Sequence, residues 1–240
     1  KLAYDKGDRD YFIMNVSNVR EFVFEMKAYA ESARNMNKYT PDAYLQRYCE
    51  NFGEYADEIK TAIVDFYQSF PELDSKYLEK HLSTYFNYTK TPPPAGITEF
   101  VLKEGSIIDY GKRITDNFDK DLSKWLCHEY AFAIKPVIAN SNSLCARFEQ
   151  ISEKLDEPLK THFKIKWLLS AKTLNYIDKW YVALHDAKIY RDEYDGENMK
   201  KSIIEASGYL FDYLNYRKCA EYGEFKNWYR GDLKMNIKQR

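Results

Sequence analysis

Residues 157–193, EPLKTHFKIKWLLSAKTLNYIDKWYVALHDAKIYRDE, decide the fold class of this chain. Their apolar residues recur every three to four positions, as expected for one face of a helix that starts at Pro158. The residues on that face are Leu159, Phe163, Trp167, Ala171, Leu174, Ile177, Tyr181 and Leu184. A helix of this length spans roughly 50 Å. Such a long amphipathic helix needs other helices to cover its apolar face.

Two further long segments supply those helices. Residues 119–155 are helix-like throughout and contain a single proline, Pro136, which we expect to kink or split the helix. Residues 196–223 repeat the helical pattern through Met199, Ile203, Ala206, Leu210, Tyr213 and Ala220. Three long amphipathic segments with short connections predict an antiparallel bundle over residues 118–240, followed by a C-terminal tail.

The N-terminal region, residues 1–90, predicts shorter helices at 19–36, 40–53, 54–70 and 74–90. The second of them has Thr40 as N-cap, Pro41 at its first position and Gly53 as its stop. Residues 91–117 contain three consecutive prolines, at positions 92–94, which forbid helix and favour an extended conformation. We therefore expect a linker and irregular segment there, and an all-α fold overall.

An isolated apolar run near the N-terminus is the exception to the helical pattern. Tyr11 to Met14, followed by Val16 and Val19, predict a buried strand over residues 10–17. A lone strand is not stable. It either pairs with a segment outside this sequence or packs irregularly.

Composition excludes several classes of protein. The 36 basic and 37 acidic residues are mixed along the chain, so we expect no nucleic-acid partner. No apolar run reaches the roughly 18–20 residues that span a bilayer, so we expect no membrane partner. The four histidines and four cysteines lack metal-ligand spacing, so we expect no metal and no cofactor. Cys127 and Cys219 lie on apolar-periodic stretches and are predicted to be buried thiols.

Aromatic residues are abundant, with 22 Tyr, 14 Phe and 4 Trp. They serve either as core and rim residues of helix packing or as stacking platforms for a sugar or peptide. The tail NWYRGDLKMN, residues 227–236, gathers Trp228, Tyr229, Arg230 and Asp232 in one candidate substrate-binding site. The alternative is structural: the two rings pack back on the bundle, and Arg230 pairs with Asp232 or with a carboxylate at a helix end.

Residues 10–73, DYFIMNVSNVREFVFEMKAYAESARNMNKYTPDAYLQRYCENFGEYADEIKTAIVDFYQSFPEL, carry a family resemblance. They resemble the region of family 115 glycoside hydrolases, the xylan α-glucuronidases, in which a catalytic barrel leads into a helical domain. MNVSNVRE corresponds to the end of a barrel strand, YLQRYCENFGEYADEI to the next two elements, and FYQSFPEL to the last. VSN replaces the family's glycine–acid pair, and Arg20-Glu21 replaces its Lys-Pro. The tail GEFKNWYRGDLKMN lies where the family closes near a GKW-like turn.

The resemblance implies the helical portion of a carbohydrate-active protein without its own catalytic barrel, acid or base. Carbohydrate is then a partner through the parent enzyme, acting on plant or host polysaccharide, and the domain supports the barrel, forms a homodimer or lines the cleft. It also implies a secreted, periplasmic or cell-surface location. The start at Lys1, without methionine or signal peptide, fits an excised piece.

Under this resemblance Asn15 and Asn18 lie near the C-terminal end of the last barrel strand, the face where barrel active sites lie. They are candidates for substrate contact. The alternative is that they only cap the strand and start the following helix, for which Asn18 is a good N-cap.

Two other functions remain open. The first is a free-standing all-α interaction module whose Tyr-rich grooves bind a partner helix. The second is a metal or redox bundle.

Overall fold

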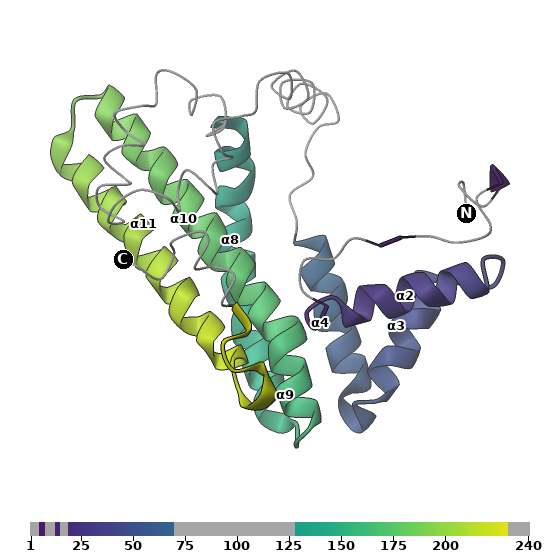
Figure 1. The fold of residues 1–240 in the computed structure, drawn as a ribbon. Helices are drawn as coiled ribbons and strands as arrows, with labels where there is room; N and C mark the ends of the chain where they lie inside the picture. Colours follow the sequence, from purple (N-terminus) through teal and green to yellow (C-terminus); the bar gives the residue numbers. More distant parts are fainter. Residues whose placement is uncertain (1–4, 8–12, 15–18, 70–127, 230–240) are drawn as a thin grey trace. The chain divides into compact units, whose positions relative to one another are not determined.

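The computed structural model describes residues 5–7, 13–14, 19–69 and 128–229. Within these ranges all regular structure is helical, so the predicted all-α fold is confirmed (Figure 1). The predicted helix at 74–90 and the linker at 91–117 lie outside the described residues. The chain forms two compact units that interleave in sequence: unit 1 is Lys1–Asp65 with Arg147–Leu168, and unit 2 is Phe66–Ala146 with Leu169–Arg240.

Unit 1 contains α2 (Val23–Arg34), α3 (Pro41–Glu50), most of α4 (Ala56–Gln68), and α9 (Leu159–Phe163) with the π-helical turn η3 (Lys164–Leu168). As predicted, α3 begins after Thr40, whose hydroxyl oxygen accepts a hydrogen bond from the Ala43 N–H at 3.2 Å. Gly53 follows α3 with φ +59°, a left-handed conformation that favours glycine. It starts the 3₁₀ turn η1 (Gly53–Tyr55) that leads directly into α4.

Aromatic and branched aliphatic side chains fill the core of unit 1. Phe148, on the part of α8 (His128–Lys154) that belongs to this unit, packs edge-to-face against Phe163 with ring centroids 5.5 Å apart. Phe163 also packs against Phe52 at 6.0 Å. Ile59, Ile63, Phe148, Phe163 and Trp167 are fully buried. Burial of each such side chain contributes about 1.5–3 kcal/mol, which makes this core the main source of the unit's stability.

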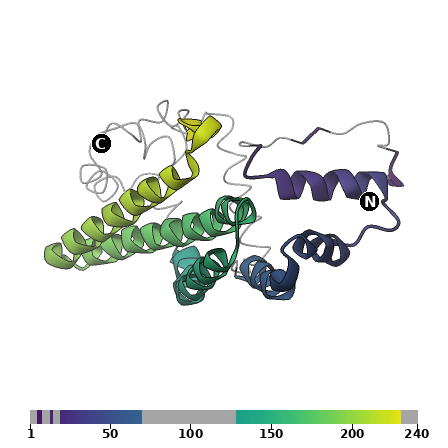
Figure 2. The ribbon, with the colours of Figure 1, turned by 90° about the horizontal axis from the view of Figure 1, so that it is seen from below.

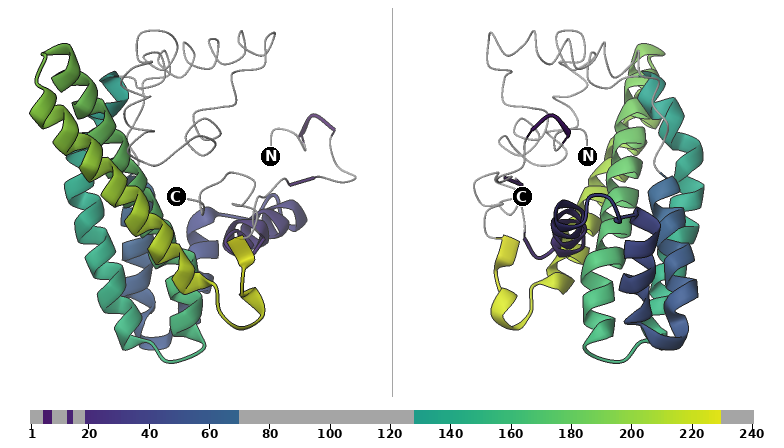
Figure 3. Two further views of the ribbon diagram at one scale, coloured as in Figure 1. Left: turned by 60° about the vertical axis from the view of Figure 1, so that its left-hand side comes forward. Right: turned by 90° about the vertical axis from the view of Figure 1, so that its right-hand side faces the viewer.

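Unit 2 contains the first part of α8, α10 (Leu169–Asp192) and α11 (Gly196–Arg217). A short turn connects α10 to α11, and the two helices run antiparallel and side by side (Figures 1 and 2). Figure 3 shows α11 following α10 along its length. The Asp195 carboxylate caps α11 by accepting the Asn198 N–H at 3.0 Å. These helices form the predicted antiparallel bundle.

Of the two outcomes expected at Pro136, a kink or a split, the split does not occur. Helix α8 runs unbroken through Pro136 for 27 residues. Proline removes one backbone hydrogen bond from a helix. The buried side chains before and after Pro136 offset that loss. Ile134 lies before the proline and Leu144 after it, and both are buried.

Two predictions about burial also need correction. Ile13 is 86% exposed, and neither Ile13 nor Met14 is in a strand, so a buried strand is not present at these two residues. An isolated strand has no ladder to join, and the rest of the 10–17 segment lies outside the described residues. Cys219 is exposed because it lies in the 3₁₀ turn η4 (Lys218–Ala220), past the end of α11. Cys49 and Cys145 are buried free thiols, and Cys127 is outside the described residues.

Candidate functional site

The structure describes two of the six predicted site residues. Asn15, Asn18, Arg230 and Asp232 lie outside the described residues, whereas Trp228 and Tyr229 lie in the C-terminal segment after α11. Of the predicted tail site, the described residues thus include only the two aromatic side chains.

Tyr229 is buried and packs against α11. The guanidinium carbon of Arg217 lies 4.1 Å from the centre of the Tyr229 ring, and the Tyr229 N–H donates to Glu221 Oε1 at 2.8 Å. The neighbouring Trp228 packs edge-to-face on Phe225, with ring centroids 5.3 Å apart. A cation over a buried tyrosine face stabilises by roughly 0.5–2 kcal/mol. The geometry at Tyr229 thus matches the structural alternative for the tail.

The most unusual polar site in unit 1 is the ammonium group of Lys166, on the π-helical turn η3. Lys166 is only 6% exposed. Its Nζ donates to Glu25 Oε1 at 2.5 Å and to the Glu21 carbonyl oxygen at 2.9 Å. These residues are about 140 positions away in sequence. The single cation ties the start of α2 to the turn that follows α9, an arrangement we call the Lys166 clamp.

Three aromatic rings surround the clamp. The Lys166 Nζ lies 5.1 Å from the centre of the Trp167 ring, 5.7 Å from Phe22 and 5.8 Å from Phe24. Burial lowers the pKa of Lys166, and the hydrogen bond and charge of Glu25 oppose that change. Because the ammonium donates to two oxygens and faces aromatic rings, it acts as a fixed charge and not as a nucleophile.

A second polar contact chain lies beside the clamp. The Trp167 Nε1–H donates to the Tyr48 hydroxyl oxygen at 2.8 Å, and that hydroxyl lies 2.9 Å from His162 Nε2. The Tyr48 hydroxyl can donate its proton to His162 when the imidazole is neutral and its Nε2 carries no hydrogen. Burial lowers the pKa of His162, as do the charges of Lys27 and Lys166. Burial also raises the pKa of Tyr48 above its usual range. The chain of donors therefore fixes ring positions at neutral pH.

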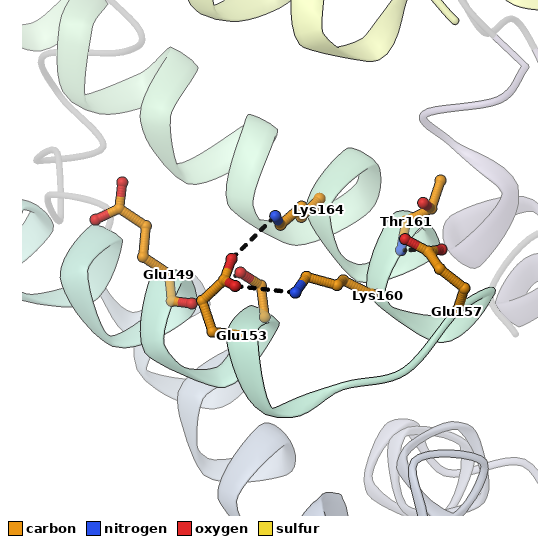
Figure 4. A network of polar contacts seen from close by, with 7 residues as sticks. Glu149, Glu153, Glu157, Lys160, Thr161 and Lys164 are labelled. Atoms are coloured by element: carbon orange, nitrogen blue, oxygen red, sulfur yellow. Dashed lines mark hydrogen bonds and ion pairs between the residues drawn. The ribbon is translucent and has the colours of Figure 1, made fainter. Parts of the chain in front are cut away.

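The surface beside α9 carries an ion-pair network (Figure 4). Glu153 accepts hydrogen bonds from Lys160 at 2.9 Å and from Lys164 at 3.1 Å, and these two lysines lower its pKa. The Glu157 carboxylate accepts from the Thr161 N–H at 3.3 Å. The carboxylates are exposed, and exposed pairs of this kind stabilise little individually. The network joins the end of α8 to α9 and holds the loop that precedes the π-helical turn.

Unit 2 buries a separate group of polar side chains between α8 and α10. Asn175 Nδ2 donates to Ser141 Oγ at 2.7 Å and to Asn142 Oδ1 at 3.0 Å. Asp178, one turn further along α10, is 3% exposed, and burial raises its pKa to about 6. The Asn175 Nδ2 group thus makes two hydrogen bonds, whereas burial shifts the Asp178 carboxyl toward its neutral form.

These sites do not form a catalytic constellation. In the part of the chain that the structure describes, no group of three or more His, Cys, Asp or Glu side chains could hold a metal ion. No helix within the described ranges is long and apolar enough to cross a membrane. Comparison of the chain with protein-family models, curated proteins and solved structures gave no match.

The residues of the clamp were not found from the sequence. Glu25 and Lys166 belong to different helices, and no local pattern links positions so far apart. One signal was present: Lys166 lies between Ile165 and Trp167 in an apolar run, where a charged residue is buried only if it is paired.

Proposed function

We propose that this chain is a non-catalytic helical accessory domain of a glycoside-hydrolase-like protein related to the xylan α-glucuronidases. The observation that carries the proposal is the Lys166 clamp. Lys166 donates hydrogen bonds to the Glu21 carbonyl oxygen and to the Glu25 carboxylate. Glu21 lies only three positions after Asn18. In this proposal Asn15 and Asn18 contact the polysaccharide bound by the parent enzyme, and the domain fixes the backbone that carries them.

Precise positioning is what such a support would supply. Catalytic and binding geometries need to be held within about 0.5 Å by rigid neighbouring groups. Two hydrogen bonds from a buried cation, together with the Arg20–Glu21 ion pair at 2.8 Å, restrict the backbone just after the asparagines. Such an anchor suits a domain that holds a neighbouring segment in place for the substrate site of the parent enzyme.

The residues that carry the family resemblance support a structural role for this domain. Tyr44, Phe52 and Ile59, from the segment YLQRYCENFGEYADEI, are all buried in the core of unit 1. Tyr48 from the same segment joins the contact chain to Trp167. The segment thus supplies packing and ring-positioning groups, which fits an accessory domain better than a catalytic one.

The proposal is tested by hydrolysis of a glucuronoxylan oligosaccharide. The 240-residue chain alone should release no uronic acid, whereas the protein encoded by the complete reading frame should release it. Turnover by the 240-residue chain alone, or none by the complete protein, would refute the proposal.

The clamp is tested in the complete protein with Lys166→Met. This variant should lower kcat/KM by about tenfold or more, because a misplaced contact group weakens transition-state binding. Lys164→Met is the matched control, since Lys164 lies in the same turn but pairs with Glu153 on the surface. The double variant Lys166→Met/Glu25→Leu removes the half-buried Glu25 carboxylate together with its cation and should recover stability without recovering kcat/KM. Full recovery of both would show that the clamp only stabilises the fold.

A free-standing interaction module is the second candidate, and one observation favours it. Helix α11 exposes two large apolar side chains, Ile204 at 53% and Phe211 at 58%. Exposed apolar residues that share a helix face mark interaction surfaces. The function of that surface does not require a catalytic partner.

A further inference from the structure

The exposed face of α11 carries a regular line of residues. Glu197, Ile204 and Phe211 of α11 are spaced seven apart and share one face of the helix, and Lys218, the first residue of η4, follows seven positions later with a helical φ of −61° and ψ of −25°. All four are exposed. Gly208 lies between the two apolar residues, and a Cβ added there would meet nothing within 4 Å. We call these five residues the α11 face.

The α11 face is complementary to itself when two copies run antiparallel. We place the two-fold axis between Ser207 and Gly208. Residues that lie equally many positions before and after the axis then face each other across the two copies. Ile204 of one copy then faces Phe211 of the other. The end of each helix places Glu197 opposite Lys218, so unlike charges meet on both sides of the axis.

A parallel pairing of the same face is unfavourable. It would set Glu197 against Glu197 and Lys218 against Lys218, and like charges that meet at a helix interface repel. The small residues at the centre also favour close approach of the two helices, because Gly208 has no side chain. The Ser207 hydroxyl is turned back on its own helix, where it donates to the Ile203 carbonyl oxygen at 2.9 Å.

We infer that the occupant of the α11 face is a second copy of this chain, bound as an antiparallel, two-fold symmetric helix pair. The same patch on both partners makes an isologous interface, the usual form of a symmetric dimer. Each copy contributes Ile204 and Phe211 to a small apolar centre and two charges to its rim. Lys218 donates to Asn215 Oδ1 at 3.0 Å in the single chain and exchanges that partner for Glu197 of the second copy.

The test is the mass of the 240-residue chain in solution, measured by sedimentation equilibrium over a range of concentrations. The expected species is a dimer with twice the chain mass of 28.5 kDa. Phe211→Glu should weaken dimerisation by about tenfold or more, since it puts a charge into the apolar centre. Ile177→Glu is the matched control: Ile177 is an exposed isoleucine on α10, outside the α11 face, and its variant should dimerise normally.

Charge exchange tests the orientation. Glu197→Lys and Lys218→Glu should each weaken the dimer, and the double variant should restore it, because every cross-pair is again of unlike charge. All four substituted positions are exposed, so helical content by circular dichroism should not change. A chain that stays monomeric at about 0.1 mM overturns the proposal, since such an affinity is too weak for a specific dimer. The proposal is also overturned if Phe211→Glu leaves dimerisation unchanged, or if Ile177→Glu weakens dimerisation as much as Phe211→Glu does. It is likewise overturned if the double charge exchange does not restore the dimer.

Discussion

Asp178 offers the sharpest prediction about stability, because its carboxyl is buried in α10 at 3% exposure. Burial raises its pKa from 3.8 to about 6. The folded state therefore holds the proton more tightly than the unfolded state. Stability that is present below about pH 4 is lost as the pH rises to about 6, and it does not return at higher pH. Two pKa units correspond to about 3 kcal/mol of unfolding free energy.

Asp178→Asn removes this titration while keeping the shape of the side chain. The variant should match the natural chain near pH 4 and exceed its unfolding free energy at pH 8 by up to about 3 kcal/mol. The assay is urea unfolding followed by circular dichroism at a series of pH values from 4 to 8. Between pH 4 and 6 the unfolding free energy of the natural chain should fall relative to that of Asp178→Asn as the pH rises.

Asp186→Asn is the matched control on the same helix. The Asp186 carboxylate accepts a hydrogen bond from Lys135 at 2.6 Å, so its loss should destabilise at neutral pH by about 1 kcal/mol or less. The two substitutions of the same chemistry thus have opposite expected signs. An equal gain from Asp178→Asn at pH 4 and pH 8, or no gain at either, would refute the reasoning from burial.

Three further substitutions test the packing. Phe163→Ala should lower the unfolding free energy by about 3–5 kcal/mol, because Phe163 is fully buried between Phe52 and Phe148. Thermal or urea unfolding measures the change, and a loss under about 1 kcal/mol would contradict the core assignment. Gly53→Ala should destabilise by about 1 kcal/mol although no atom lies near the added Cβ, because φ is +59°; an unchanged melting temperature would show that the turn relaxes. Tyr229→Ala should lower the melting temperature more than Trp228→Ala, because Tyr229 is the buried residue stacked on Arg217, and the reverse order would return the tail to a ligand-binding role.

Locally encoded features were predictable from the sequence. Thr40 and Pro41 mark the start of α3, and Gly53 begins the 3₁₀ turn that follows it, because capping and φ preferences depend only on neighbouring residues. The long helices of the bundle were found from their periodicity. The Lys166 clamp was not found, because an ion pair between residues 141 positions apart leaves no trace in local pattern. The same holds for the hydrogen bond from Asn175 to Ser141, which depends on how two helices meet.

The register of the long helix shows why periodicity alone assigned some buried positions incorrectly. Phe163, Trp167 and Ala171 follow one another in steps of four, which in a regular α-helix would drift by roughly 40° at each step. The π-helical turn Lys164–Leu168 has more residues per turn and so shifts this register, and all three residues are buried.

From Ala171 onward the helix is regular, and geometry then decides which residues are buried. Asn175 lies roughly 40° from Ala171 around the axis and Asp178 roughly 20°, whereas Ile177 lies about 120° away. The sequence pattern predicted burial of Ile177, which is in fact 42% exposed, while polar Asn175 and Asp178 are buried. Helix α10 therefore buries a line of residues that includes two polar side chains. Asn175 offsets the cost of this burial with two hydrogen bonds, whereas the buried Asp178 carboxyl lowers the stability of the fold above about pH 6, where it ionises.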